Sequence, residues 1–242
     1  MITIVKPHYY WPVTSLKMFP YIMEHIERCG RICYKSEDKI TEDSAERFVA
    51  NICRNRHESV LEHCAITAIV VCSRACSHQL VRHRIAAYSQ ESQRYCDYGK
   101  KSSLQVICPQ SIDVGPGDYD AEYWDELSWR ISKDGKQFKL PLGIDRRVFE
   151  RQKQWIVNVD CAYSEYKAEL AEGIPPGDAR YVLPNATKTE LAVTFNLRQW
   201  RHVFQERALN RHAQWEIRGI FSGILIDLKG LLPAVFGDLE VE

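Results

Sequence analysis

The chain has 242 residues, and its 32 lysine and arginine residues are balanced by 32 acidic residues, so its formal net charge is zero. A protein whose main task is to bind nucleic acid usually has a general excess of basic residues, so this balance argues against that class. Hydrophobic residues make up 45% of the chain and aromatic residues 11%, which excludes a largely disordered protein. The length is enough for one large domain or two small ones, each with its own core.

The cysteines and the apolar segments predict a cytoplasmic protein without a disulfide framework. There are nine cysteines, which is an odd number, and none forms a CxxC pair. No secretory signal opens the chain, and the apolar run at 64–72 is too short to span a membrane. Cys72 and Cys76 are four residues apart, a spacing that could place two metal ligands on one helix face. Free cysteines more often pack as small hydrophobic residues, so we expect no metal site.

The predicted elements of the first half of the chain alternate between strands and helices. In chain order they are a strand at 1–6, a helix at 41–56, a strand at 65–72, a helix at 74–84 and a polar loop at 85–103. Apolar residues of the first helix recur at helical spacing, and Thr41 is placed to be its N-cap. The strand at 65–72 is continuous and rich in β-branched residues, which is typical of a buried strand.

The second half of the chain continues this alternation. It contains a predicted short helix around 119–132, a helix at 145–172, a strand at 189–196 and helices at 197–207 and 213–231. Gly173, followed by Pro175 and Pro176, is expected to end the helix at 145–172. We find no repeat and no linker, so the elements predict a single α+β domain over residues 1–242.

Residues 73–95 carry a local positive charge within the neutral chain. Four arginines face a single acid, Glu91, which gives a local charge of +3. Arginine binds phosphate through two parallel hydrogen bonds, and the neighbouring serine and glutamine side chains can recognise the edge of a base or a flavin ring. A solvated basic helix end is the structural alternative, because cations also favour a helix C-terminus.

Two further polar clusters accompany this segment. HESVLEH at 57–63 has two histidines six residues apart, a poor spacing for a metal site, and predicts a turn whose polar groups face a ligand or cap the turn. A second positive cluster extends through 180–216, where Arg198 shares a helix face with His202. The two positive clusters, distant in sequence, could close on one polyanionic ligand. The chain has no GxGxxG or GxxxxGK[ST] motif, so conventional nucleotide-binding loops are disfavoured.

These clusters carry a resemblance to a known family. RHRIAAYSQES at 82–92 has the arrangement RHR-x7-S, which resembles the signature of the flavin-dependent thymidylate synthases. HESVLEH at 57–63 is similar to that family's HxS/TxxEH segment. DARYVLP at 178–184, NLRQWRHVFQER at 196–207 and AQWEIR at 213–218 match later family segments in the expected order. Together these segments span most of the chain.

The resemblance implies a fold and a reaction. The fold would be an α+β domain with a central antiparallel or mixed sheet flanked by helices, assembled as a homotetramer whose active sites lie between subunits. The reaction would be the reductive methylation of dUMP to dTMP, with methylenetetrahydrofolate as carbon donor, NADPH as reductant and FAD as bound cofactor. Unlike the cysteine-dependent thymidylate synthases, this family uses no cysteine nucleophile, so no cysteine is assigned a catalytic role.

The resemblance also implies site residues. FAD would be held by Ser59, Glu62, Arg82, His83, Arg84, Gln90, Asn196, Arg198 and His202. The substrate dUMP would be held by Gln79, Arg82, Gln90, Ser92, Arg94, Arg180 and Arg207. Arg207 would be the catalytic residue, because a fixed cation against the uracil ring stabilises the ionised form of the ring. No metal, nucleic acid or membrane partner is implied.

Some positions depart from the family pattern. Cys33 stands where many members have a serine near the flavin phosphate, and a thiol is a poorer hydrogen-bond donor. Between Arg207 and Ala213 the chain is one residue longer than in some members, and residues 108–150 have no clear counterpart. Two other functions stay open on sequence grounds: RNA binding by the basic stretch 74–101, and a different flavin oxidoreductase that acts on a nucleotide or folate.

Overall fold

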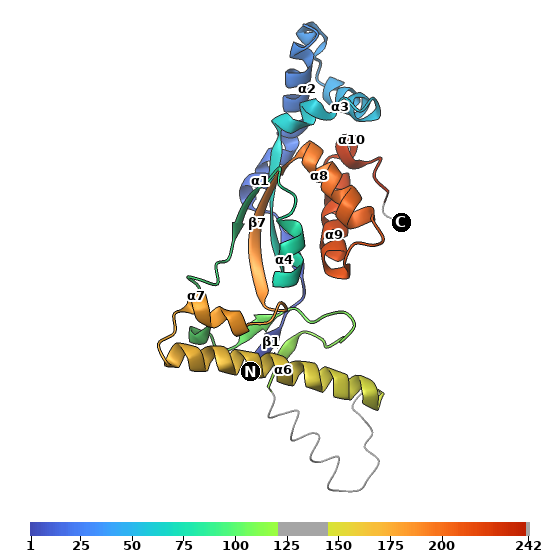
Figure 1. Cartoon of the computed structure of the whole chain (residues 1–242). Coiled ribbons are helices and arrows are strands. Elements are labelled where there is room, and N and C mark those ends of the chain that lie inside the picture. Colours follow the sequence, from blue (N-terminus) through green and yellow to red (C-terminus); the bar gives the residue numbers. More distant parts are fainter. Residues whose placement is uncertain (121–144, 241–242) are drawn as a thin grey trace. The chain divides into compact units, whose positions relative to one another are not determined.

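The computed structural model describes residues 1–120 and 145–240 (Figure 1). The chain folds into two compact units, each assembled from several segments. The first unit contains 1–6, 73–75 and 91–189, and the second contains 7–72, 76–90 and 190–242. Each unit has its own sheet and its own helices, so the predicted α+β class is confirmed. The expected single central sheet is replaced by two sheets of three and four strands. The assignment of residues 1–242 to one domain stays a prediction.

The first unit is built around strand β1 (Ile2–Ile4), which lies at the centre of a mixed sheet. It pairs in parallel with β5 (Leu104–Val106) and antiparallel with β6 (Gly117–Tyr119). The long helix α6 (Arg146–Ala171) runs along this sheet, and the two share a buried apolar cluster (Figure 1). Gly173 follows at a φ of +87°, a conformation that glycine adopts without strain, so the predicted end of this helix is confirmed. The short helices are η4 (Tyr98–Lys100), α7 (Pro176–Ala179) and η6 (Arg180–Val182).

The second unit contains a four-stranded sheet with the order β2-β3-β7-β4. The strands are β2 (His8–Tyr10), β3 (Ala65–Ser73), β7 (Lys188–Asn196) and β4 (Ala87–Gln90). Buried and partly exposed residues alternate along the whole of β7, as a strand with one face toward the core requires. The long strands β3 and β7 agree with the sequence prediction to within one residue at each end.

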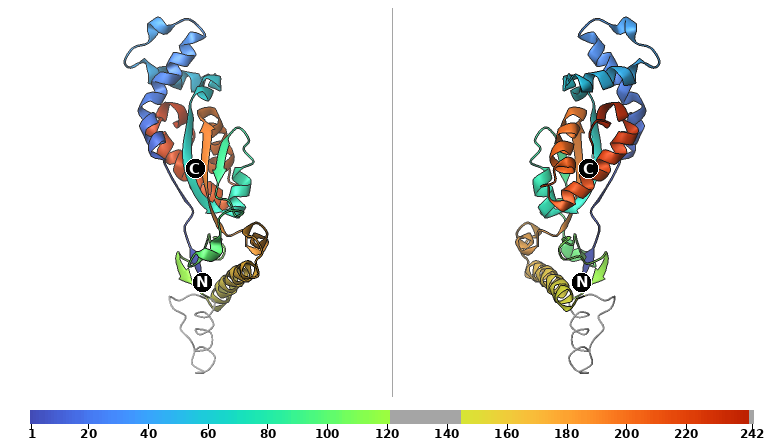
Figure 2. Two further views of the ribbon diagram at one scale, coloured as in Figure 1. Left: turned by 90° about the vertical axis from the view of Figure 1, so that its left-hand side faces the viewer. Right: turned by 90° about the vertical axis from the view of Figure 1, so that its right-hand side faces the viewer.

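Helices cover this sheet and complete the core. They are α1 (Val13–Met18), η1 (Phe19–Tyr21), α2 (Ile22–Ile32), η2 (Glu37–Lys39), α3 (Ser44–Arg54), η3 (Glu58–His63), α4 (Arg74–Leu80), α8 (Leu197–Phe204), the π-helix η7 (Gln205–Leu209), α9 (Trp215–Leu231) and α10 (Pro233–Phe236). Helices α8 and α9 lie along the sheet in every view (Figures 1 and 2). The buried Trp200 of α8 joins the helix to the sheet, because its indole N–H donates to the Ile66 carbonyl of β3 and its ring packs edge-on against Phe195 of β7, with centroids 4.8 Å apart. None of the helices that the structure describes could cross a membrane.

The structure corrects several predicted boundaries. The helix expected at 41–56 begins at Ser44, and Thr41 is not its N-cap: the Thr41 N–H instead donates to the Ser44 hydroxyl at 2.9 Å. The helix expected at 74–84 ends at Leu80, where the Tyr88 hydroxyl lies 2.8 Å from the Leu80 carbonyl oxygen and satisfies the helix end. The loop expected at 85–103 contains strand β4 and the turn η4.

Two other regions complete this comparison. Helix α2 was not predicted, although its buried residues recur at helical spacing. The short helix expected around 119–132 begins on Tyr119, which is the last residue of strand β6, and its remainder lies outside the described residues.

Candidate functional site

A polar pocket of about 630 Å³ opens in the second unit between η3, the turn after α4 and the polar face of α8. Its walls are formed by Glu58, Glu62, Arg82, His83, Arg84, Ile85, Asn196, Arg198, Gln199, Arg201, His202 and Gln205. Seven of these residues were predicted as site residues from three separate sequence segments. The fold therefore brings the RHR triplet, the HESVLEH turn and the later basic cluster onto one concave surface, whose size suits a small-molecule ligand.

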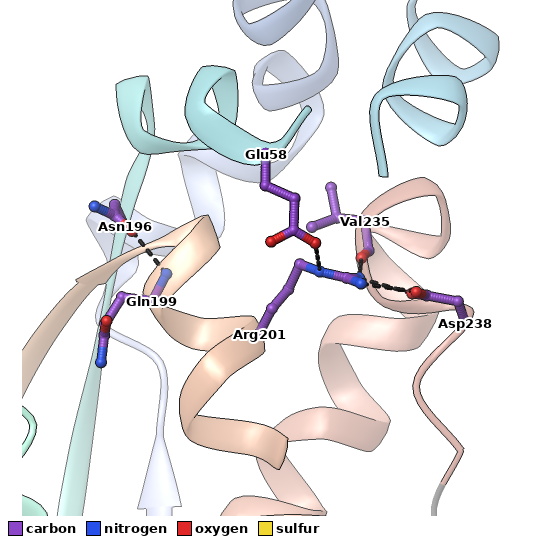
Figure 3. Close-up of polar contacts among 6 residues, drawn as sticks. All are labelled: Glu58, Asn196, Gln199, Arg201, Val235 and Asp238. Atoms are coloured by element: carbon purple, nitrogen blue, oxygen red, sulfur yellow. Dashed lines mark hydrogen bonds and ion pairs between the residues drawn. The ribbon is translucent and has the colours of Figure 1, made fainter. Parts of the chain in front are cut away.

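The junction of β7 and α8 places the polar side chains of one wall. The side chain of Asn196 caps α8 by accepting a hydrogen bond from the Gln199 backbone N–H at 2.7 Å (Figure 3). Arg198, two residues further on, donates to a Glu62 carboxylate oxygen at 2.6 Å, and both side chains are about half exposed. Asn196 therefore has a structural task in addition to any contact with a ligand. The exposed ion pair of Arg198 with Glu62 is weak, so Arg198 could leave Glu62 to bind a ligand.

His83 lines the pocket and contacts Arg207. The Arg207 Nε–H donates to Nε2 of the buried His83 at 3.0 Å, so this imidazole nitrogen carries no proton. Burial and the charge of Arg207 lower the pKa of His83 to about 4, and the ring of His202, with its centroid at 6.1 Å, contributes in the same direction. His83 is therefore neutral near pH 7, and the positive charge of Arg207 stays uncompensated by it.

Arg207 belongs to the π-helix η7, which continues directly from α8. A π-helical turn accommodates one residue more than an α-helical turn and is often found at functional sites. This irregular turn contains Arg207 itself and the first residues of the segment from Arg207 to Ala213.

A second arginine on this helical stretch, Arg201, was not among the predicted site residues. Its Nε–H donates to Glu58 at 3.0 Å, and its two terminal nitrogens donate to the two carboxylate oxygens of Asp238, each at 2.7 Å (Figure 3). The Val235 carbonyl accepts a further bond from it. Burial acts to lower the pKa of Arg201, but the hydrogen bond and charge of Asp238 outweigh burial and raise it. The Arg201 hydrogen bond in turn lowers the pKa of Asp238.

The remaining predicted flavin residues and two predicted substrate residues of the second unit, Ser59, Gln79 and Gln90, are not among the residues that line this pocket. Ser59 lines a neighbouring cavity of about 830 Å³ together with the exposed Cys33, and Glu58 and Arg198 line both cavities. Gln79 is half-buried on α4, and the Gln90 amide donates to the Ser77 hydroxyl at 3.0 Å.

Three predicted substrate residues, Ser92, Arg94 and Arg180, lie in the first unit. The Ser92 hydroxyl accepts a hydrogen bond from the Arg94 backbone N–H at 3.3 Å. Arg94 and Arg180 meet at Gly177: the Arg180 Nε–H donates to the Gly177 carbonyl at 2.9 Å, and a Cβ at Gly177 would lie 3.8 Å from Cγ of Arg94.

The cysteine pair considered as a metal site is fully buried. The ligand atoms of Cys72, Cys76 and the buried Glu216 lie within 4.8 Å of one another. A hydrogen bond with Cys72 and burial raise the pKa of the Cys76 thiol, so this thiol is protonated when no metal is bound. The expectation that the two cysteines pack as small hydrophobic residues, without a metal, stays a prediction.

Comparisons with known proteins agree with this geometry. A family model described as "Thymidylate synthase complementing protein" matches residues 17–234. The chain is 37% identical over 216 residues to a flavin-dependent thymidylate synthase of Geobacter sulfurreducens, covering 86% of this chain and 78% of that relative. It is 35% identical over 193 residues to a flavin-dependent thymidylate synthase of Pyrococcus furiosus, covering 79% of this chain and 65% of that relative.

A solved structure is also similar in fold. It is that of PolB, a UMP/dUMP methylase from Streptomyces cacaoi bound with 5-Br dUMP. It superposes with a TM-score of 0.65 and 20% sequence identity, over 98% of this chain and 96% of that chain. At this level of identity, the likeness supports the fold alone.

Proposed function

Because the chain belongs to the thymidylate synthase complementing protein family, we propose that it catalyses the reductive methylation of dUMP to dTMP with FAD as bound cofactor. Methylenetetrahydrofolate would be the carbon donor and NADPH the reductant. The observation that carries this proposal is the pocket in the second unit, where the three sequence segments that resemble the family's flavin-dependent thymidylate synthases meet. The active form would be a cytoplasmic homotetramer whose sites combine residues from more than one subunit.

The donor set of the pocket fits a flavin nucleotide. Its guanidinium groups match the phosphates, and its amide and imidazole groups match the polar edge of the ring. The residues that would hold FAD are Ser59, Glu62, Arg82, His83, Arg84, Gln90, Asn196, Arg198 and His202, and all of them except Gln90 line this pocket or the neighbouring cavity. The bound flavin would supply the hydride chemistry, while the protein supplies binding and orientation.

Arg207 is the proposed catalytic residue. His83 accepts its hydrogen bond as a neutral group, so a full positive charge remains on the guanidinium, fixed in position. Placed against the uracil ring of dUMP, this cation would stabilise negative charge that develops on the pyrimidine. The residues that would hold dUMP itself are Gln79, Arg82, Gln90, Ser92, Arg94 and Arg180.

We assign no nucleophilic role to the cysteines. A nucleophilic cysteine requires an accessible thiolate, but burial raises the pKa of both Cys53 and Cys64 to about 11. Cys72 and Cys76 are fully buried. Within the described part of the chain, neither of the exposed cysteines, Cys33 and Cys161, forms a hydrogen bond with a basic side chain.

The proposed function is tested with the purified full chain. It should be yellow or become yellow on incubation with FAD, and it should form dTMP from dUMP only when methylenetetrahydrofolate and NADPH are both supplied. Replacing each of the nine cysteines by serine, one at a time, should leave dTMP formation measurable in every variant that still folds. A protein that cannot be loaded with FAD and forms no dTMP would contradict the proposal.

A further inference from the structure

We propose that Arg201 is a positioning residue that ties the C-terminal turn, residues 233–238, to the helix η3 and thereby holds one wall of the flavin pocket in place. Arg201 extends from α8 and reaches the first residue of η3, Glu58, on one side and Asp238 on the other (Figure 3). The helix η3 also carries Ser59 and Glu62, two proposed flavin contacts. The effect on flavin binding rests on the proposed function. The positioning of η3 and the C-terminal turn rests on the observed contacts alone.

The hydrogen-bonding capacity of Arg201 explains why it positions other groups rather than binding a ligand. A guanidinium has five N–H donors. The bonds to Glu58, Val235 and Asp238 occupy four of them, and only 7% of the side chain is exposed. Its charge faces two carboxylates, so little donor capacity or net charge is left for a ligand.

The charge of Glu58 explains why this tie matters to the pocket. Glu58 lines the pocket, the neighbouring cavity that contains Ser59, and a third cavity of about 920 Å³ next to Asp238. An unpaired carboxylate there would repel the phosphates of a flavin nucleotide, whereas the ion pair with Arg201 offsets part of the charge of Glu58. Asp238 holds Arg201 through two parallel bonds, which fix the plane of the guanidinium as well as its place. Weakening the hold at Asp238 therefore lets the guanidinium plane turn, and its Nε–H is no longer held in line with Glu58.

The C-terminal turn is suited to this task because its apolar residues are anchored. Val235 and Phe236 of α10 are fully buried, and Phe236 packs edge-on against Phe204 with ring centroids 5.6 Å apart. Helix α10 also packs against α3, which carries Cys53. The charges of Arg201, Asp238 and Glu58 all affect the pKa of the Cys53 thiol. The buried Cys53 thiol is therefore a natural reporter of this network.

The experiment compares Asp238→Asn with a matched control, Glu240→Gln, in the full chain. Both changes remove one negative charge near the C-terminus, but Glu240 makes none of the contacts to Arg201. Asp238 is 56% exposed, so neither change creates a buried defect that would prevent folding. Asp238→Glu restores the carboxylate and serves as the conservative variant.

Two readouts are measured. The first is the alkylation rate of Cys53 by iodoacetamide, followed on the Cys53 peptide by mass spectrometry. The second is the dissociation constant of FAD, together with the visible circular dichroism of the bound flavin. We expect Asp238→Asn to raise both the Cys53 alkylation rate and the FAD dissociation constant roughly tenfold, the effect of one charge-assisted hydrogen-bond pair. Glu240→Gln should match the wild type, and Asp238→Glu should recover at least part of both properties.

The two readouts separate the possible failures. If Asp238→Asn equals Glu240→Gln in both, Arg201 has no positioning role. If Cys53 becomes reactive while FAD affinity and the dichroism stay unchanged, the tie is purely structural and the proposal is likewise overturned. If the wild type itself binds no FAD, the proposed function fails, and the Cys53 rate still shows whether Asp238 holds the network.

Discussion

Arg201 and Arg207 lie six residues apart on one helical stretch, and their surroundings are opposite. Arg201 faces the carboxylates of Glu58 and Asp238, and its charge is compensated. Arg207 faces the neutral imidazole of His83, and within the described part of the chain no carboxylate forms an ion pair with it. The partner therefore decides what an arginine can do: a compensated guanidinium fixes structure, and an uncompensated one can stabilise charge on a ligand.

The largest expected effect is on the uncompensated side of this comparison. Arg207→Ala should lower the rate of dTMP formation about 10²- to 10³-fold, the usual loss when one preorganised electrostatic donor is removed. FAD should still bind, as measured by its absorption spectrum. The matched control is Arg211→Ala, which removes the same charge four residues further on. If Arg211→Ala abolished turnover and Arg207→Ala did not, the register assigned to this segment would be wrong.

The compensated arginine should instead govern stability. Arg201→Met removes the guanidinium and leaves Glu58 and Asp238 unpaired, so the free energy of unfolding in urea should fall by about 2 kcal/mol. This value is below that of a fully buried pair, because Asp238 is largely exposed. Arg198→Met, which breaks the exposed pair with Glu62, should cost less than about 1 kcal/mol. Equal losses in the two variants would contradict the distinction.

The sequence predicted one of these arginines and not the other, for a physical reason. Arg207 belongs to a continuous run that matches a family segment, so its role could be inferred from neighbouring residues alone. The task of Arg201 depends on Asp238, which is 37 residues away in sequence and follows a helix, α10, that no periodic pattern announced. A four-residue helix that begins at a proline is too short to show a period.

The same limit applies to the fold. The long strands β3 and β7 and the helix α6 were predicted because their patterns extend over many residues. The four residues of β4 are a strand only because they pair with Leu191–Thr194 of β7, about a hundred residues away in the chain. The division into two sheets likewise depends on pairings between distant segments, such as β1 with β5.

Because the partner of Arg207 is a histidine, the stability of the folded protein should depend on pH. In the folded protein the pKa of His83 is lowered to about 4, whereas in the unfolded chain it is near its ordinary value of about 6.5. The unfolded state therefore binds more protons between these values, and stability falls as the pH falls from about 6.5 to 4. We expect a loss of about 1.5 kcal/mol from this group, less than the full shift implies because the ring borders the open pocket.

Urea unfolding of the wild type and of His83→Asn between pH 4.5 and 7.5 measures this contribution. The variant has no titrating group at this position, so the difference between the two curves should change over the window from about pH 6.5 to 4 and be constant above it. A difference that is constant across the whole range would mean that His83 keeps its ordinary pKa, and Arg207 would then face a partner that is charged in weak acid.

The smallest expected effect concerns Asn196. This residue combines a structural role, like that of Arg201, with a proposed ligand contact, like that of Arg207. Its side chain caps α8 and also faces the pocket. Asn196→Ala should lower the free energy of unfolding by about 1 kcal/mol, the usual cost of losing an N-cap. The comparison variant is Asn196→Asp, which keeps the oxygen that accepts the capping hydrogen bond but adds a negative charge to the pocket. Its free energy of unfolding in urea should therefore match that of the wild type, while its FAD dissociation constant should rise. If Asn196→Asp bound FAD as tightly as the wild type, Asn196 would be a structural residue of the Arg201 kind, and its assignment to the flavin site would have to be withdrawn.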